Sequence, residues 1–296
     1  MFKKVLEEVV LSKVCYDEPM KKHTSLCVGG NSDYYVEVNT LCSLNQLVSL
    51  AKKHRVCYKV LGFGSNVLVS DKGYNGLIIS IKKINDIFYK RDYIQAMAGA
   101  SLDSLIKFNR EHDLSGLEAL SGIPASVGGA IVMNAGAFGR SISDSLVEVH
   151  TLCNGKIKKY HKTDCKFSYR TSRFLNSREI IICGLFDFEK SNREAITERE
   201  KTYLDIRKTK QPQGRTCGSV FKNPYPYYAG ELIERAGLKG FSIGGATVSE
   251  KHANFITVST NTTASDVHKV ISYIKDKIQK DFGISLEEEV EYLGEF

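Results

Sequence analysis

Three side chains have chemistry that a plain structural role does not need: Arg170, Ser219 and Glu289. Arg170 lies in an aromatic-flanked segment that is typical of a strand, where a guanidinium needs an anionic partner. Ser219 stands in a Gly-Ser turn with a lysine and an asparagine close behind it. Glu289 lies in a segment where apolar and acidic residues alternate, and it projects from the face opposite the apolar side chains. Each also has a plain interpretation: a salt-bridged surface arginine, a turn serine and a solvated strand face.

A second feature is the stretch from Ala119 to Gly139, which has no charged residue over 21 positions and contains five glycines and one proline. Its length first suggests a membrane helix, but nine of its residues are Gly, Pro, Ser or Asn, a composition too polar for lipid and poor for a helix. We expect a buried turn system in which the backbone closely approaches a large, flat, phosphorylated cofactor. A tightly packed core loop is the alternative.

The segment Gly62–Asn66 is a glycine turn at the end of a predicted strand. Successive backbone N–H groups in such a turn form a concavity that binds anions, and Ser65 and Asn66 add donors. The segment is not the dinucleotide fingerprint, because Gly64 leads into a strand and not into a helix. A plain hairpin would also explain it.

The triplet Cys217-Gly218-Ser219 raises a nucleophile hypothesis, for which His252 is the one candidate base. Neither a G-x-S-x-G nor a cysteine-protease signature accompanies it, which makes a hydrolase a weak alternative. The eight cysteines form no C-x-x-C pair and no His cluster, so we predict no metal site and free thiols in a reducing cytosol.

The bulk composition is that of an ordinary globular protein of two or three compact units, with 296 residues, 42% hydrophobic and 25% charged. The net charge of +7 fits an anionic ligand, but it is too dispersed for nucleic acid. The mixed-charge N-terminus indicates no secretion signal. We therefore predict a cytoplasmic protein with no nucleic-acid partner and no membrane insertion, and a monomer because no exposed heptad is evident.

Apolar periodicity predicts the elements that must position these residues. The predicted helices are an amphipathic one within residues 1–20 that includes Val10, then 44–51, 102–108, 189–210, 231–233 and 267–278, the last stopped by Gly283. The predicted strands are 34–38, 58–61, 67–69, 77–81, 93–98, 146–153, 156–160, 180–182 and 284–292, with a hairpin turned at Asn154-Gly155.

The chain resembles the UDP-N-acetylenolpyruvoylglucosamine reductase family nearly end to end. The motifs that carry the resemblance follow in order: His23-Thr24-Ser25, Gly29-Gly30, Leu61–Asn66, Gly122–Ala130, Met133–Gly139, Tyr169-Arg170, Gly218–Pro224, Ala236–Gly240 and Ser249–Phe255. Each is weak alone, but their order is highly specific. No long insertion interrupts the last third, which is typical of the short family type without an added tyrosine loop. Phe63, Cys27 and Phe138 depart from the family pattern as tolerated changes, and Glu291 stands where an arginine is common, which puts one substrate-carboxylate contact in question.

The resemblance implies an α+β fold in which a two-subdomain FAD-binding unit of the vanillyl-alcohol-oxidase/PCMH type precedes an α+β substrate-binding domain. The implied boundaries are residues 1–80, 81–192 and 207–296. FAD, held non-covalently, would contact both glycine segments, at Gly62, Gly64, Ser65, Asn66, Gly122, Ile123, Pro124, Gly128, Gly129, Val132, Asn134 and Gly136. NADPH would be the co-substrate.

The resemblance also implies roles for Arg170, Ser219 and Glu289. The reaction adds hydride beside a carboxylate and creates an enolate-like charge, which Arg170 and a protonated Glu289 would stabilise while Ser219 donates the proton. The nucleotide-sugar substrate would contact Tyr169, Arg207, Lys222, Asn223 and His252. Two alternatives stay open: a related FAD-dependent oxidase of the same fold, and a non-catalytic flavin- or nucleotide-binding module.

Overall fold

The computed structural model describes residues 2–9 and 13–296, so Val10 of the predicted first helix lies outside the described residues. The chain forms two compact units. Unit 1 consists of Met1–Cys15, Tyr34–Phe63 and Gly76–Ile206, and unit 2 of Tyr16–Asp33, Gly64–Asn75 and Arg207–Phe296. The last segment of unit 2 begins where the third domain was predicted to begin. The predicted boundary at residue 80 has no counterpart in this division and stays a prediction.

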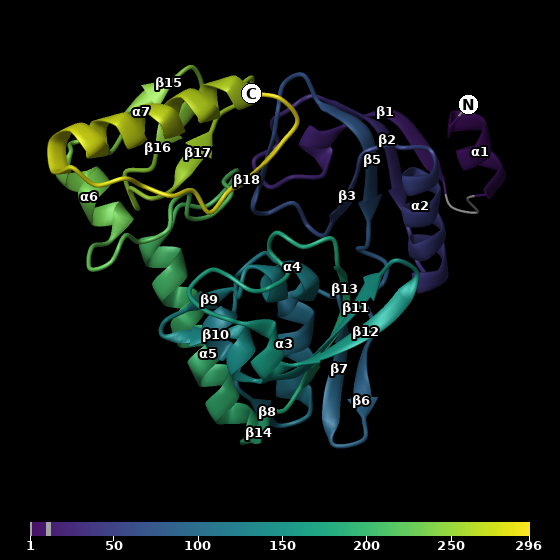
Figure 1. The fold of residues 1–296 in the computed structure, drawn as a ribbon. Helices are drawn as coiled ribbons and strands as arrows, with labels where there is room; N and C mark the ends of the chain where they lie inside the picture. Colours follow the sequence, from purple (N-terminus) through teal and green to yellow (C-terminus); the bar gives the residue numbers. More distant parts are fainter. Residues whose placement is uncertain (1, 10–12) are drawn as a thin grey trace. The chain divides into compact units, whose positions relative to one another are not determined.

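The first sheet has the strand order β1–β2–β5–β3, with β3 parallel to β5 (Figure 1). Its strands are β1 (Val14–Pro19), β2 (Asn31–Glu37), β3 (Tyr58–Leu61) and β5 (Tyr74–Ser80). Before it lies α1 (Phe2–Val9), and α2 (Leu41–Lys53) begins at Thr40, whose side chain accepts a hydrogen bond from the Ser43 N–H. Leu44, Leu47 and Ala51 recur at helical spacing on α2 and are buried in the core of unit 1, as the sequence predicts.

A second sheet in unit 1 is antiparallel, with the order β12–β11–β13–β7–β6. Its strands are β6 (Ile87–Lys90), β7 (Tyr93–Met97), β11 (Leu146–Cys153), β12 (Lys156–His161) and β13 (Ile180–Phe186). The predicted hairpin at Asn154-Gly155 is confirmed: both residues have positive φ, which suits the twist of a two-residue hairpin. The short helix α4 (Val127–Val132) packs on β13 and β7 (Figure 1).

Unit 1 also contains further helices and short strands. They are α3 (Leu102–Glu111), β8 (Leu114–Ser115), η2 (Glu118–Leu120), β9 (Gly136–Ala137), β10 (Arg140–Ser141), η3 (Ile142–Asp144), η4 (Lys162–Cys165), β14 (Glu189–Lys190) and most of α5 (Arg193–Lys210). The predicted charged helix begins at Arg193 and not at Glu189, because Glu189 and Lys190 pair with β8 as a short strand.

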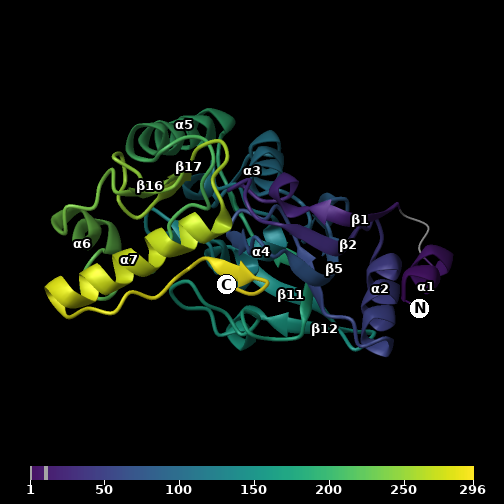
Figure 2. The same cartoon turned by 90° about the horizontal axis from the view of Figure 1, so that it is seen from above.

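Unit 2 has its own core, built around α7 (Ala264–Phe282), which packs on the sheet β15–β16–β17 (Figure 2). The other elements that lie wholly in this unit are η1 (Met20–Lys22), β4 (Val67–Val69), α6 (Ala229–Arg235), β15 (Ser242–Ile243), β16 (Ala246–Val248), β17 (Ile256–Val258) and β18 (Glu291–Leu293). Gly283 ends α7 at φ 69°, as predicted. The predicted final strand over 284–292 is wrong in extent, since only β18 forms at its end. Over the described residues, no helix is long and apolar enough to cross a membrane.

Candidate functional site

The glycines of the Gly62–Asn66 turn are required by close backbone and side-chain neighbours. A Cβ on Gly62 would lie 2.2 Å from the Ser126 Oγ atom, within unit 1. Gly64 has a φ of +64°, and its Cβ would lie 2.2 Å from the His23 carbonyl oxygen, within unit 2. The strand that follows, β4, pairs in parallel with β18, so the plain-hairpin interpretation is wrong.

The glycine stretch is a turn system around one short helix. Ser126 caps α4 by accepting the Gly129 N–H, and the Gly128 N–H donates to the Ala98 carbonyl at 2.8 Å. A Cβ on Gly128 would lie 2.9 Å from that of Ala98, so this glycine allows the close approach of two segments. Gly122, Pro124 and Gly129 are exposed, whereas the other residues from Ala119 to Ala137 are buried or half-buried. Exposed backbone between buried neighbours fits the predicted approach to a flat cofactor, and the six-residue helix is the part that sequence composition did not predict.

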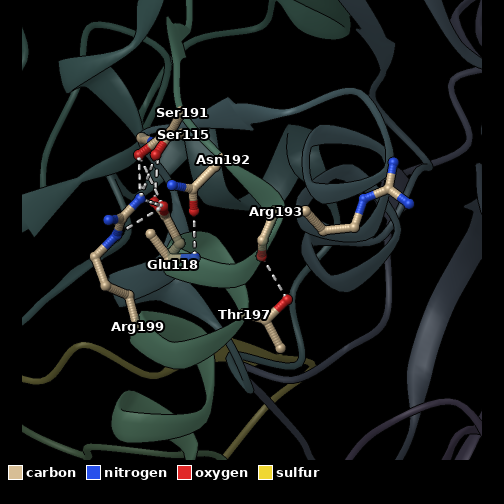
Figure 3. A network of polar contacts seen from close by, with 9 residues as sticks. Ser115, Glu118, Ser191, Asn192, Arg193, Thr197 and Arg199 are labelled. Atoms are coloured by element: carbon tan, nitrogen blue, oxygen red, sulfur yellow. Dashed lines mark hydrogen bonds and ion pairs between the residues drawn. The ribbon is translucent and has the colours of Figure 1, made fainter.

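A buried carboxylate holds the start of this stretch. Glu118 is 6% exposed and accepts hydrogen bonds from the Ser115 hydroxyl and the Gly116 N–H, both at 2.8 Å, and from two nitrogens of Arg199 on α5 (Figure 3). Burial, the largest single contribution, raises the pKa of Glu118, but these hydrogen bonds together hold it below its ordinary value. Since η2 also packs on β9 and β10, this network supports both ends of the glycine stretch.

Arg170 lies in a tight turn and not in the predicted strand. The turn runs from Ser168 to Thr171, whose backbone groups exchange two hydrogen bonds of 3.2 Å. Arg170 has a φ of +52°, and its guanidinium lies 5.3 Å from the ring centroid of Tyr169. A Cβ on Gly136 would lie 3.4 Å from the Arg170 Nη1 atom. The structure therefore brings Tyr169, Arg170 and the end of the glycine stretch together in unit 1.

Ser219 and Glu289 lie on neighbouring segments of unit 2. The Glu289 N–H donates to the Val220 carbonyl at 2.8 Å, and the Lys222 N–H donates to the Glu287 carbonyl at 2.8 Å. The Asn66 side-chain amide donates to the Glu289 carbonyl at 2.8 Å, so this predicted cofactor residue also ties β4 to the Glu289 segment. Two of the three predicted catalytic residues are thus adjacent, whereas Arg170 belongs to unit 1.

The other predicted substrate residues in unit 2 have identifiable partners. The Lys222 ammonium lies 2.5 Å from a carboxylate oxygen of Glu287, and the Asn223 Oδ1 atom accepts the Ala229 N–H at the start of α6. Arg207 donates to the Gln211 side chain at 3.4 Å. The His252 Nδ1 atom accepts the Asn254 N–H at 3.2 Å.

Sequence reasoning missed one residue of this region, Asn254. Its side-chain oxygen accepts the Phe221 N–H at 3.0 Å and its amide donates to the Phe221 carbonyl at 2.8 Å. Asn254 therefore fixes the backbone two residues beyond Ser219. It lay inside a recognised motif, but only its pairing with a distant segment reveals its role.

The hydrolase alternative is disfavoured by the surroundings of Cys217. The thiol is buried, with 4% of the residue exposed, and burial raises its pKa to about 12. At neutral pH such a cysteine has almost no thiolate, which is the nucleophilic form. Cys217 packs in the core of unit 2 with Val220 and Phe221.

Comparisons with known proteins first define the class. A model described as "FAD binding domain" matches residues 32–160, and a model described as "UDP-N-acetylenolpyruvoylglucosamine reductase, C-terminal domain" matches residues 210–293. A structure of Physcomitrella patens BBE-like 1 shares the fold, with a TM-score of 0.50 and 15% identity over 64% of this chain and 44% of that one. The two matched family models make the chain an FAD-containing oxidoreductase.

Its family follows from full-length relatives. UDP-N-acetylenolpyruvoylglucosamine reductase of Caldanaerobacter subterraneus is 39% identical over 99% of this chain and 97% of its own, and that of Bacillus pumilus is 38% identical over 99% and 98%. The crystal structure of the Thermus caldophilus reductase matches with a TM-score of 0.82 and 32% identity, covering 96% of this chain and 99% of that one. The chain belongs to the UDP-N-acetylenolpyruvoylglucosamine reductase family. The predictions of family, fold class and FAD as cofactor are confirmed.

Proposed function

We propose that the chain reduces UDP-N-acetylenolpyruvoylglucosamine to UDP-N-acetylmuramate with electrons from NADPH, as a monomer in the cytoplasm, for peptidoglycan precursor synthesis. The observation that carries the proposal is the pairing of the Ser219 and Glu289 segments, through the Glu289 N–H and the Val220 carbonyl at 2.8 Å. This pairing brings the two backbone segments together, which supports the assignment of the proton donor and the carboxyl group to one site in a chain that also has an FAD-binding domain.

The residues that would hold FAD form two sets. Gly62 and Gly64, where a Cβ has no room, form a tight turn to which Ser65 and Asn66 add donors, and the exposed backbone of Gly122, Pro124 and Gly129 supplies a flat approach. Ile123, Gly128, Val132 and Gly136 complete the predicted set on the same stretch. Held by these residues, FAD would supply the hydride-transfer chemistry between NADPH and the substrate's terminal methylene carbon.

The chain's own side chains must handle the charge that this reduction creates. Hydride addition to the methylene leaves an enolate-like charge on the adjacent carbon and its carboxylate. Arg170 and a protonated Glu289 stabilise that charge, and Ser219 gives its hydroxyl proton to the carbon. Lys222 stabilises the resulting alkoxide, while Tyr169, Arg207, Asn223 and His252 bind the nucleotide sugar.

In this chain, the substrate contact that an arginine commonly makes in the family must be made by a residue other than the one at that position. Glu291 occupies that position, is exposed, and donates its backbone N–H to the Asn66 carbonyl at 3.0 Å. A carboxylate there repels the substrate carboxylate, so Arg170 is the cation proposed for that group.

The test follows the bound flavin in the purified protein. We expect a yellow flavin spectrum, bleaching on anaerobic addition of NADPH, and recovery on addition of the enolpyruvyl sugar. NADPH consumption that depends on oxygen and ignores the sugar would instead identify an oxidase. A flavin that NADPH does not bleach would identify a binding module without this activity.

The Ser219→Ala variant tests the proton donor. It should bleach with NADPH at the wild-type rate, while reoxidation by the enolpyruvyl sugar slows by roughly 10²–10⁴-fold, the usual contribution of a positioned general acid. Stopped-flow absorbance of the flavin separates the two half-reactions. Wild-type reoxidation in this variant would remove Ser219 from the mechanism.

A further inference from the structure

Two hydrogen bonds join the end of the glycine stretch to the turn that carries Arg170. The Asn134 side-chain amide donates to the Ser168 carbonyl at 2.9 Å. On the other side of the turn, the Ser172 hydroxyl donates to the Val132 carbonyl at 2.7 Å. Arg170 therefore lies between two anchors, both of which end on residues 132–134 of the stretch predicted to bind flavin.

The turn needs these anchors because Arg170 has a backbone conformation that is unfavourable for a residue with a long side chain. Arg170 has a φ of +52° and Asn134 a φ of +44°. Asparagine tolerates this left-handed region, but a long side chain such as arginine rarely adopts it. The Ser168 carbonyl already accepts the Thr171 N–H at 3.2 Å, and the Asn134 amide is its second donor. The Asn134 bond thus stabilises one of the two carbonyls that close the turn around Arg170.

The burial of Asn134 also favours a role inside the protein. The residue is 8% exposed, and within the described parts of the chain its Oδ1 atom is buried with no hydrogen-bond donor. Burial shields the hydrogen bond from the Asn134 amide to the Ser168 carbonyl, so water cannot readily replace the amide when it is removed. Nearby, Gly136 has no Cβ that would crowd the Arg170 guanidinium.

We propose that Asn134 is a positioning residue for Arg170: it sets the guanidinium through the Ser168 carbonyl and is not itself a ligand of the cofactor. The proposal rests on the proposed function, because Arg170 is assigned there to the substrate carboxylate. It replaces the sequence-based assignment of Asn134 to FAD. Its consequence is that the glycine stretch has two tasks, one toward the cofactor and one toward the residue that polarises the substrate.

The test uses Asn134→Gly, because glycine keeps the positive φ and removes the whole side chain together with its amide. We expect its FAD dissociation constant and its rate of bleaching by NADPH to stay within about twofold of wild type. Reoxidation by the enolpyruvyl sugar should slow by roughly 10- to 100-fold, the cost of a small misplacement at a reacting centre. In the full-length protein without FAD, trypsin should cleave after Arg170 faster than in wild type, as read by mass spectrometry.

A double variant shows whether the effect passes through Arg170. Asn134→Gly combined with Arg170→Ala should reoxidise no more slowly than Arg170→Ala alone, because the residue being positioned is already gone. The matched control is Asn109→Ala, another buried asparagine of unit 1, which should leave both half-reactions and the cleavage after Arg170 unchanged.

Three outcomes would overturn the proposal. Weaker FAD binding in Asn134→Gly would make Asn134 a cofactor ligand, equal slowing of both half-reactions would make its role generally structural, and independent effects in the double variant would separate it from Arg170. A wild-type protein whose reduced flavin the enolpyruvyl sugar fails to reoxidise is a distinct result. That result overturns the proposed function, while cleavage after Arg170 still reports on the link between Asn134 and the turn.

Discussion

Two buried asparagines anchor the two parts of the candidate site, and they do so differently. Asn254 in unit 2 uses both side-chain polar atoms, one on each backbone group of Phe221. Asn134 in unit 1 uses only its amide, on the Ser168 carbonyl. The segment beside Asn254 is also held by backbone bonds, since the Val220 N–H donates to the Asn254 carbonyl at 2.9 Å and the Glu289 N–H to the Val220 carbonyl.

Because the two asparagine anchors differ in this way, we expect one to affect mainly the stability of the fold and the other mainly the alignment of site residues. Around Ser219, backbone hydrogen bonds join the Val220, Asn254 and Glu289 segments. A side-chain substitution there therefore changes either the stability of the fold or the chemistry of the reaction. Around Arg170, a turn with positive φ is closed by its own two backbone bonds and joined to the glycine stretch by two single side-chain bonds, those of Asn134 and Ser172. We therefore expect the anchor in unit 2 to affect the free energy of unfolding most, and the anchors in unit 1 to affect cofactor or substrate alignment most.

The largest expected change in stability comes from Asn254→Ala. The substitution leaves the N–H and the carbonyl of Phe221, a residue 1% exposed, without their side-chain partners. Each buried unsatisfied group costs about 1–3 kcal/mol, so the free energy of unfolding should fall by about 2–4 kcal/mol. Urea denaturation measures it, with Asn134→Gly as the comparison. A larger loss in Asn134→Gly would reverse the contrast between the two anchors.

A smaller loss is expected from Glu118→Gln at the start of the glycine stretch. The amide keeps the shape but removes the charge that faces Arg199 and one acceptor (Figure 3). Hydrogen bonds to charged groups contribute about 1.5–3 kcal/mol, and the loss should approach the lower value because the Arg199 side chain is 42% exposed and can be hydrated. Because η2 leads into Gly122–Pro124, FAD affinity should fall too, as measured by flavin fluorescence.

The pH dependence of the unfolding free energy is the control for the Glu118→Gln prediction. The folded pKa of Glu118 lies below its ordinary value of 4.5, so its stabilisation is present above that pH and is lost as the pH falls through the folded pKa. The difference in unfolding free energy between wild type and Glu118→Gln should therefore shrink below pH 4.5. A difference that is constant with pH would mean that the charge of Glu118 does not stabilise the fold.

Local patterns predicted much of the fold. The strand Tyr58–Leu61, the hairpin at Asn154-Gly155 and the helix end at Gly283 are all confirmed, because each depends on neighbouring residues. The final strand was overextended, since the alternation at Leu286 and Val290 reflects burial in the core of unit 2 and not a continuous ladder. Alternation alone cannot distinguish these two causes.

The sequence suggested which residues belong to the candidate site. It did not predict the hydrogen bonds that hold those residues in position. The resemblance supplied Ser219 and Glu289, yet their adjacency depends on pairing between distant segments. Arg170 was placed in a strand because its aromatic neighbours favour one, whereas the structure has a turn with positive φ. Asn134 was assigned to the cofactor because it lies in the glycine stretch, and only the distance to the Ser168 carbonyl indicates another role.

The smallest predicted effect concerns His252, a titratable residue that is hydrogen-bonded to Asn254, the anchor in unit 2. Burial lowers the pKa of His252 below its ordinary value of 6.5, and its Nδ1 atom accepts the Asn254 N–H, so the folded state favours the neutral ring. Between the folded pKa and 6.5 the unfolded chain binds the extra proton, so stability is lost as the pH falls through that range. The slope from one such group is at most about 1.4 kcal/mol per pH unit.

The variant His252→Gln removes this titration and keeps an acceptor for the Asn254 N–H. Its unfolding free energy should fall less than that of wild type between pH 7 and pH 5, in urea titrations at each pH. Asn134→Gly, whose anchor contains no titratable group, should keep the wild-type pH slope. Parallel curves for wild type and His252→Gln would show that His252 does not titrate with folding, and the anchor at Asn254 would then be as insensitive to pH as the anchor at Asn134.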